Sequence, residues 1–501
     1  MVLNLNEFLV ESSQLFSVLD QPSAHNWPGL EGSLKYVDST LTSLDTWPLR
    51  VRDVRAVLGT VRNRSRSLVP LRKLPNEVVA RILSFLGAEC VINDTSEKRD
   101  LSLALTAVSM TSKWLRNTAT STSSLWTHFD ILMDGLNQDA YMCHARSCLL
   151  YSGRQHLYID IFDASCEYAK NRSRRMIALL APHAHRIISI GLHATLRLAK
   201  ETLFDLFSDS TSPPTRELCL DGCDSSIDNS DADFYNRVSN GRLDEFLKLL
   251  QKVRIRGPFL PLQSAMYRGL TVLKLYVYKM VAAHPTIAEF TNVLAASPEL
   301  RALVLVCLEL DMSSNTLPEP VLVSNLELLD LREMATSELL GLLSCIITGS
   351  AELALSVMGD PNMLQDETAR LHEFVNRSNV TRLLLQSPYS NRHPPKPPPL
   401  LLTHVFPTVQ ELALCEYVLK PLVDIRPIDM SHFPSLHTLH LLQYRPTTDS
   451  LHSVVHSSSI RVIYTDDIYC ELLSEASPSV QYRSYSTIFE GDGDLEWPLM
   501  L

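Results

Sequence analysis

Glycine is scarce in this chain, and the motifs that depend on glycine or on paired catalytic residues are missing. Only 16 of the 501 residues are glycine, about 3%, where soluble proteins usually have about 7%. The sequence contains no Gly-x-Ser-x-Gly, Gly-x-x-x-x-Gly-Lys-Ser/Thr, His-Glu-x-x-His or Gly-x-Gly-x-x-Gly segment. These absences argue against the common nucleophile, phosphate-binding and zinc-protease sites, so we expect a non-catalytic protein without a cofactor.

The chain also lacks a surplus of basic residues and a long apolar run. Its net charge is −11 and its pI is about 5.8, which argues against general nucleic-acid binding, because a phosphate backbone needs a basic surface. No apolar stretch approaches the roughly 18 residues of a membrane-spanning helix, and Glu7 and Glu11 stand where a secretory leader would be apolar. We expect a protein of the cytoplasm or nucleus, not secreted, with no membrane or nucleic-acid partner.

Cysteines are present, but none has the spacing of a metal site. The sequence has ten, and the only close pairs are Cys143/Cys148 and Cys219/Cys223. Neither pair forms the Cys-x-x-Cys pattern of zinc ligands. Buried reduced thiols are the interpretation that we favour, and no metal is expected.

What the sequence does have is a large apolar fraction. Hydrophobic residues make up 45% and the mean hydropathy is +0.02, which suits a globular chain with an extensive core. Within residues 1–66, apolar residues recur at helical spacing on both sides of Pro48, which predicts an N-terminal helical segment. Packing onto a core is its expected role, and a partner-binding helix is the alternative.

A short helix is predicted directly after Leu74. Pro75 suits the first helical position, where its missing N–H costs nothing, and Gly87 suits the helix end. Apolar residues recur in steps of three and four from Val78 to Leu86. These residues form an apolar face that is wider than contact with one neighbouring helix would bury.

Two further helices are expected over 101–108 and 109–119, after a polar loop. The ordered set of Leu74-Pro75, the apolar stripe, Lys113-Trp114 and Leu125-Trp126 resembles the F-box, a three-helix module, here over about 69–130. The loop over 88–100 is longer than usual, and Met110-Thr111 replaces the usual Val-Cys. An ordinary helical subdomain with its tryptophans in the core is the alternative.

The resemblance implies a partner for this module. F-boxes bind the small adaptor subunit of a cullin–RING (SCF-type) ubiquitin ligase. Carried onto this sequence, the adaptor-binding residues are Leu74, Pro75, Val78, Ile82, Leu83, Leu86 and Trp114.

A strand motif recurs through the rest of the chain. Segments such as 270–277, 300–307 and 326–333 fit apolar-x-x-Leu-x-Leu, with weaker copies such as 186–193. Successive motifs are mostly 24–30 residues apart, near the period of leucine-rich repeats, and 250–257 is expected to fill the one double gap. The last apolar positions of the motifs are Leu192, Leu220, Leu275, Leu305, Leu331, Leu355, Leu385, Leu414 and Leu441.

The expected fold is therefore α/β, with N-terminal helices over 1–66, an F-box-like domain over 69–130 and an irregular leucine-rich-repeat solenoid over 131–501. A strand followed by a helix cannot bury its own apolar face, and stacked repeats build a continuous core. Parallel strands should lie inside, and helices such as those over 286–297, 335–349 and 366–378 outside. Three residues beyond the anchors, only Cys223 matches the Asn or Cys of regular repeats, so uneven turns are expected.

Alternation along each strand predicts which side chains line the concave face of the sheet. The leucines of Leu-x-Leu point into the core, and the intervening residues point to the concave face. This mixed polar and apolar face suits protein recognition. A solvated face without a partner is the alternative, and the Pro-rich segment 393–399 and the acidic run 221–233 are competing sites. The expected target-binding residues are Lys274, Tyr276, Asp330, Arg332, Gln386, Glu411 and His440.

These patterns together predict a non-catalytic subunit of a ubiquitin ligase that recruits a protein target. In this hypothesis the F-box-like domain binds the ligase adaptor, and the repeats hold the target. The alternative is a leucine-rich-repeat scaffold or binding protein, in which the F-box-like segment only caps the solenoid.

Overall fold

A computed structural model describes residues 35, 74–88, 101–133, 138–163, 170–207, 215–222, 245–257, 262–277, 284–313, 317–358, 364–386, 404–415, 430–442, 460–465 and 480–484. They fall into two compact units. The first unit includes the described residues up to 128 together with 147–155, and the second includes 129–146 and the residues from 156 on. The helices predicted over 1–66 (Lys35 apart), the polar loop after residue 88 and the segment 393–399 lie outside the described residues.

Helices make up the first unit. They are α4 (Asn76–Ala88), α5 (Leu101–Thr111), α6 (Lys113–Ser121), the short helix η5 (Ser123–Trp126) and the last residues of α7 (Gln138–Tyr151). The third helix begins later than expected, because the Ser112 hydroxyl caps α6 by accepting a hydrogen bond from the Leu115 N–H at 3.1 Å. The indole N–H of buried Trp126 donates to the carbonyl oxygen of Ala119 at 2.7 Å, which ties η5 to α6.

The second unit contains a large parallel sheet. Among the described residues, 14 strands follow one another in chain order, and every pair whose register is defined is parallel. They are β1 (His128–Leu132), β2 (Leu157–Phe162), β3 (Ile187–His193), β4 (Glu217–Asp221), β5 (Lys252–Arg256), β6 (Val272–Tyr276), β7 (Ala302–Val306), β9 (Leu328–Arg332), β11 (Leu353–Met358), β12 (Val380–Gln386), β13 (Glu411–Cys415), β14 (Thr438–Leu442), β15 (Val462–Thr465) and β16 (Gln481–Ser484).

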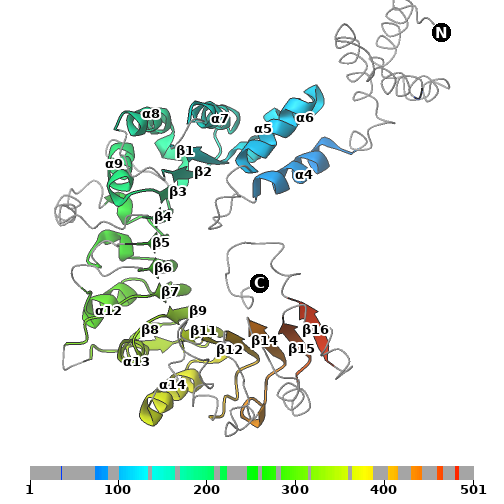
Figure 1. The fold of residues 1–501 in the computed structure, drawn as a ribbon. Coiled ribbons are helices and arrows are strands. Elements are labelled where there is room, and N and C mark those ends of the chain that lie inside the picture. Colours follow the sequence, from blue (N-terminus) through cyan, green and yellow to red (C-terminus); the bar gives the residue numbers. More distant parts are fainter. Residues whose placement is uncertain are drawn as a thin grey trace, which may run out of the picture. The chain divides into compact units, whose positions relative to one another are not determined.

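Helices connect many of these strands and cover one face of the sheet. The connecting elements are α7 (Gln138–Tyr151), α8 (Lys170–Leu180), η6 (Ala181–Arg186), α9 (Leu196–Phe207), η8 (Ala265–Tyr267), α12 (Ile287–Ala295), α13 (Thr336–Ser344), α14 (Gln365–Arg377) and η10 (Met430–His432). A separate parallel pair joins β8 (Val321–Val323) to β10 (Ile346–Thr348). Within this unit the strands form a curved stack, with α8, α9, α12, α13 and α14 on its outer side (Figure 1).

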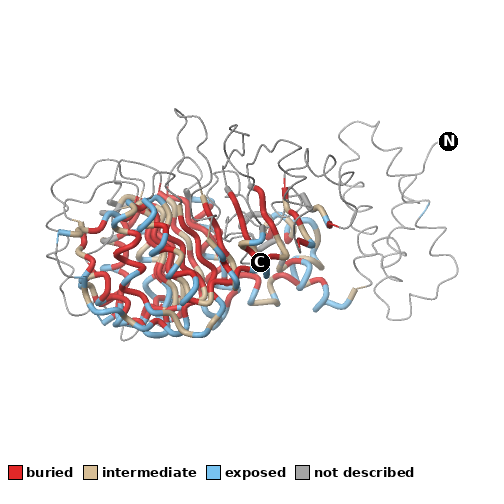
Figure 2. The backbone as a smooth tube through the Cα atoms, turned by 90° about the horizontal axis from the view of Figure 1, so that it is seen from below, coloured by how far each residue is buried: buried red, intermediate tan, exposed pale blue. Residues whose placement is uncertain are grey.

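A ladder of aligned apolar residues fills the space between strands and helices. Leu275 is paired in register with Leu305, and Leu305 with Leu331. All three are 0–1% exposed. The buried residues follow the strands through this unit (Figure 2). The fold is α/β with a large parallel sheet, consistent with a solenoid of the leucine-rich-repeat kind, and β5 confirms the strand expected over 250–257.

Two details of the predicted repeat need correction. The residue in register with Leu331 and Leu385 is Val357, not the expected Leu355. The apolar-x-x-Leu-x-Leu pattern places the anchor two residues early, because Leu355 also points into the core, where it is 1% exposed. The sheet also extends beyond the predicted strands through β1, β2, β15 and β16, whose apolar positions carry other residues than the Leu-x-Leu pair.

At the ends of the strands, backbone hydrogen bonds replace those that Asn or Cys side chains make in regular repeats. The N–H of Gly257 donates to the carbonyl of Tyr276, and the N–H of Cys307 donates to the carbonyl of Arg332. Residues directly after strands adopt positive φ in three places, at Gly257 (107°), Cys307 (56°) and Glu333 (56°). Backbone groups therefore carry the hydrogen bonding at these turns, at a conformational cost for the two non-glycine residues.

No helix in the described part of the chain is both long and apolar enough to cross a membrane.

The ladder predicts that shortening one of its leucines is costly. Leu305→Ala or Leu331→Ala should lower the free energy of unfolding by about 2–5 kcal/mol, because each change leaves a cavity in a closed core. Denaturant unfolding followed by circular dichroism measures the loss. Leu322→Ala is the matched control, because Leu322 is 59% exposed and should cost about 0.5 kcal/mol or less. Equal, small effects at all three positions would mean that the ladder is placed on the wrong face.

Candidate functional site

The concave face of the sheet presents rows of side chains that cross the strands. Parallel register brings residues about 26–30 positions apart into direct contact, so that Lys274 lies beside Val304 and Val304 beside Asp330. A second row joins Tyr276 to Val306 and Val306 to Arg332. The first row reads, from β2 to β15, Asp160, Gly191, Cys219, Arg254, Lys274, Val304, Asp330, Ser356, Leu384, Ala413, His440 and Tyr464.

The residues expected to bind a target all lie on this face, but they are not equally accessible. Lys274, Tyr276, Arg332, Gln386 and Glu411 are half-buried. The Asp330 carboxylate is largely buried and accepts hydrogen bonds from the guanidinium of Arg332 at 2.7–3.0 Å. These two residues neutralise each other at the centre of the sheet.

His440 does not have the exposure that the sequence predicts. It is 2% exposed, and its ring stacks on Tyr464 with a centroid distance of 4.5 Å. Burial lowers the pKa of His440 to about 3, so the ring is neutral at physiological pH. Alternation predicted its face correctly, but accessibility depends on residues outside its own strand.

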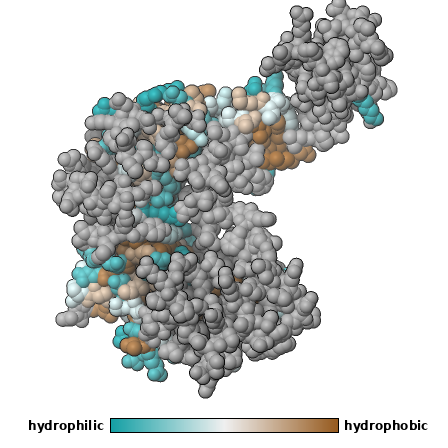
Figure 3. Space-filling view, in the orientation of Figure 1, coloured by the Kyte–Doolittle hydropathy of each residue, from teal (hydrophilic) through white to brown (hydrophobic). Residues whose placement is uncertain are grey.

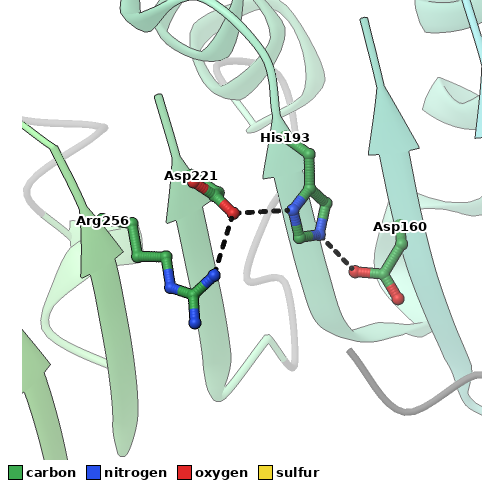
Figure 4. Close-up of polar contacts among 4 residues, drawn as sticks. All are labelled: Asp160, His193, Asp221 and Arg256. Carbon is green, nitrogen blue, oxygen red and sulfur yellow. Dashed lines mark hydrogen bonds and ion pairs between the residues drawn. The ribbon is translucent and has the colours of Figure 1, made fainter. Parts of the chain in front are cut away.

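A charged network that the sequence analysis missed crosses β2 to β5 (Figure 4). The imidazole of His193 lies between two carboxylates, with Nε2 3.4 Å from Asp160 Oδ1 and Nδ1 3.5 Å from Asp221 Oδ2. A guanidinium nitrogen of Arg256 lies 3.9 Å from the same oxygen of Asp221. Four successive strands thus contribute alternating negative and positive side chains.

Local packing holds this network in place. A Cβ at Gly191 would collide with the Asp160 carboxylate, so glycine on β3 makes room for Asp160 to reach His193. The His193 ring stacks on Phe162, with a centroid distance of 4.3 Å and an interplanar angle of 10°. The side chains are only partly exposed, at 11% for His193, 20% for Asp160 and 26% for Asp221. Partial burial strengthens the interactions between these charges.

The network shifts the pKa values of its members. Burial alone would lower the pKa of His193, but hydrogen bonds and charge attraction from Asp160 and Asp221 together raise it to about 9. The pKa of Asp221 is lowered, because the attraction of His193 and the two arginines exceeds the opposing effect of burial. Asp130 on β1 has its pKa raised to about 7 by burial and by the negative charge of Asp160. At neutral pH, His193 is therefore a cation between two anions.

Basic and aromatic side chains continue the row on β5 and β6. The guanidinium carbons of Arg254 and Arg256 lie 5.6 and 5.2 Å from the centre of the Tyr276 ring, within cation–π range. Lys274 is in register with Arg254. The next strand, β7, is apolar, and its Val304 and Val306 form a buried cluster with Leu328 and Ala354, against which Tyr276, Ala302 and Cys307 pack. Figure 3 shows hydrophilic residues near β5 and hydrophobic residues near β7.

This arrangement favours the recognition of a binding partner. The ionisable groups of β2–β5 are held by one another, and the face changes from charged to apolar within two strands. Among the described residues, no group of three or more His, Cys, Asp or Glu side chains is placed to hold a metal ion. The alternation rule that identified Lys274 also identifies His193, Asp221, Arg254 and Arg256 when it is applied to the weaker copies over 186–193, 215–222 and 250–257.

The residues expected to bind a ligase adaptor lie in the first unit. Pro75 is exposed, and Val78 and Ile82 on α4 are 42% and 41% exposed. Leu74 and Trp114 are half-buried, and the side chain of Leu86 lies outside the described residues. Leu83 is only 4% exposed, so it packs inside the unit and cannot present its side chain to a partner.

Comparisons with known proteins give little guidance. No protein-family model matches the chain, and no curated protein matches it. Among solved structures, a leucine-rich-repeat protein of Leptospira interrogans is similar, with 13% sequence identity and a TM-score of 0.27, over 73% of this chain and 98% of that one. The order and parallel register of the strands define the fold.

The charged network predicts a pH-dependent contribution to stability. The raised pKa of His193 means that its contribution is complete below its unfolded pKa of about 6.5 and is lost as the pH rises through about 9. Compared with His193→Gln, the unmodified protein should lose about 2 kcal/mol between pH 7.5 and 9.5, a window in which Asp130 is already mainly ionised.

Urea unfolding at a series of pH values measures this difference. His440→Gln is the control, because His440 is neutral in both the folded and the unfolded state across this window, so its difference from the unmodified protein should not change with pH. A flat difference for His193→Gln as well would contradict a cationic His193 between two carboxylates.

Proposed function

We propose that this chain is a non-catalytic, substrate-recruiting subunit of a cullin–RING ubiquitin ligase. In this proposal the F-box-like helices bind the small adaptor subunit, and the concave face of the sheet binds the protein to be ubiquitinated. The ubiquitin transfer itself is performed by other subunits, so the chain needs no nucleophile, metal or cofactor of its own.

The observation that carries the proposal is the pair of apolar stripes on α4. One stripe, Val79 and Leu83, is 0% and 4% exposed and packs inside the unit. The other, Val78 and Ile82, remains about two-fifths exposed. Figure 3 shows hydrophobic side chains gathered over this helix. Exposed apolar surface on a folded unit marks a site for a partner, and these residues follow the Leu-Pro start of the F-box pattern.

The concave face supports the second half of the proposal. Tyrosine and arginine are the side chains most often found as energetic anchors of interfaces, and Tyr276 and Arg332 stand in one row, separated by Val306. Lys274, Gln386 and Glu411 add polar contacts on the same face, and Asp330 acts through its pairing with Arg332. His440 is too deeply buried to take part.

A leucine-rich-repeat binding protein without a ligase role is the second candidate. In that case the α4–α6 helices serve only as a cap. The burial of Leu83 and the half-burial of Leu74 and Trp114 favour this candidate, because a cap uses its apolar residues internally. The two candidates differ in whether the exposed stripe of α4 has a partner.

Charging the exposed stripe separates these candidates. Val78→Asp combined with Ile82→Asp should reduce co-purification of the adaptor and cullin at least tenfold, because two carboxylates would have to be desolvated at the interface. Affinity purification of the tagged full chain with quantitative mass spectrometry measures the loss. Glu77→Gln combined with Arg81→Gln is the control on exposed positions of the same helix, and it should leave capture unchanged.

A folded Val78→Asp/Ile82→Asp variant that still captures the adaptor would disprove the F-box assignment. Circular dichroism of both variants establishes folding. If the unmodified chain captures neither adaptor nor cullin, the binding-protein candidate is favoured instead.

A further inference from the structure

Asp130 on β1 is a buried carboxyl group that the recognition surface does not use. It is 8% exposed. Within the described part of the chain, its carboxyl group takes part in no hydrogen bond and no ion pair. An ionised carboxylate in such a place is costly, because burial removes its water and no protein donor replaces it. The neutral, protonated form avoids this cost.

The hydrogen bonds at the strand ends place Asp130 beside Asp160. After β2, β3 and β4, the next residue donates its N–H to the neighbouring strand, and the accepting carbonyl belongs to the residue in register with the last residue of the strand. After β1, the N–H of Met133 donates to the carbonyl of Phe162 at 2.8 Å. The same parallel offset puts Leu132 beside Phe162, and Asp130, two residues earlier, beside Asp160.

Asp160 has a carboxylate oxygen that can accept a proton from this neighbour. Its Oδ1 lies 3.4 Å from Nε2 of His193 (Figure 4), and among the described residues Oδ2 has no partner. Neighbouring strands are about 4.8 Å apart, which brings the two carboxyl groups within reach of one shared proton. Since two adjacent carboxylates repel each other, one member of such a pair keeps its proton to a higher pH than an isolated carboxyl group does.

The charged groups around Asp130 come from several strands. Burial has the largest effect on its pKa and raises it, Asp160 on β2 raises it further, and His193 on β3 lowers it, so that the pKa is about 7. On its own strand, His128 stands two residues earlier and is exposed. Asp221 on β4 lies on the far side of His193, 3.5 Å from its Nδ1. Asp130 therefore loses its proton around neutral pH.

We propose that Asp130 is a pH-sensitive switch for the pairing of β1 with β2. In its protonated form it donates a hydrogen bond to Asp160 and stabilises the pairing, and in its ionised form it repels Asp160 and weakens the pairing. The chain passes from the first unit to the second within β1, between His128 and Phe129, so the switch acts on the strand that joins them. This inference goes beyond the ligase proposal, because it requires neither an adaptor nor a target.

Amide hydrogen exchange of the full chain, corrected for the intrinsic effect of pH on exchange, measures the opening of β1. Because the pKa of Asp130 is raised, the paired state has its full stability below the ordinary pKa of about 3.9 and loses stability as the pH rises to about 7. The opening constant of peptides that cover residues 129–133 should rise about tenfold from pH 5 to pH 6 and about twofold from pH 7 to pH 8. An opening constant that is the same at pH 5 and pH 7 would contradict the proposal.

Asp130→Asn distinguishes a protonated carboxyl group from a residue that only fills space. The amide keeps a donor for Asp160 but cannot ionise, so the tenfold rise should disappear, and at pH 8 the opening constant should be at least about tenfold lower than in the unmodified chain. Asp139→Asn is the matched control, because Asp139 is an exposed aspartate on α7, and it should keep the unmodified pH profile.

Infrared difference spectroscopy tests the proton itself. The difference between the unmodified chain and Asp130→Asn at pH 5.5 should contain the carbonyl stretch of a protonated carboxyl group, and this band should be absent at pH 8.5. The proposal is wrong if the band is missing at pH 5.5, or if Asp130→Asn leaves the pH profile of β1 unchanged. If this variant does not fold, the pH profile of the unmodified chain alone supports or overturns the proposal.

Discussion

The structure depends on one constraint: a strand with a single apolar face must place that face in register with the strands on both sides. None of the segments around Leu275, Leu305 or Leu331 can bury its leucines alone. Once aligned, each leucine is covered by the two neighbouring repeats and by the outer helices. A slip of one residue would turn every leucine of the strand to the concave face. Burial therefore fixes the register of the whole sheet.

The composition of the concave face follows from this register. Because the core residues fix which residues become neighbours, side chains far apart in sequence meet in rows. Asp160, His193 and Asp221 come from three separate repeats, each about 30 residues from the next, and meet only because β2, β3 and β4 are in register. The register also places the basic residues of β5 and β6 beside one another and next to the apolar residues of β7. Charge pattern and recognition surface are thus consequences of core packing.

Local sequence was enough to predict the strands with regular leucines, their core residues and several of the outer helices. Leu305 and Leu331 are buried as expected, because period-two alternation is a property of the segment itself. The register of β11 was misjudged because Leu355 and Val357 both face the core, and only the neighbouring strands distinguish them. The strands β2 and β15 were missed because isoleucine and valine take the place of leucine.

The site was less predictable, because its properties depend on contacts between repeats. Alternation predicted that His440 would face the concave side. Its stacking on Tyr464 and its burial depend on residues of other strands, so the sequence of its own strand does not predict them. His193 stood in a recognised weak repeat, yet its charge depends on carboxylates 28 and 33 residues away. Gly191 is a further example, because its lack of a side chain makes room for Asp160, which lies on a different strand.

Disulfide trapping tests the register most directly. Ala302 on β7 is in register with Leu328 on β9, so the Cα atoms are about 5 Å apart, within the range of a disulfide, whereas Asp330, two residues further along, lies about 8 Å away, beyond it. Ala302→Cys with Leu328→Cys should form an intramolecular disulfide on mild oxidation, seen by peptide mass spectrometry. Ala302→Cys with Asp330→Cys should not. Efficient trapping of the shifted pair in place of the aligned pair would contradict the register on which the concave face depends.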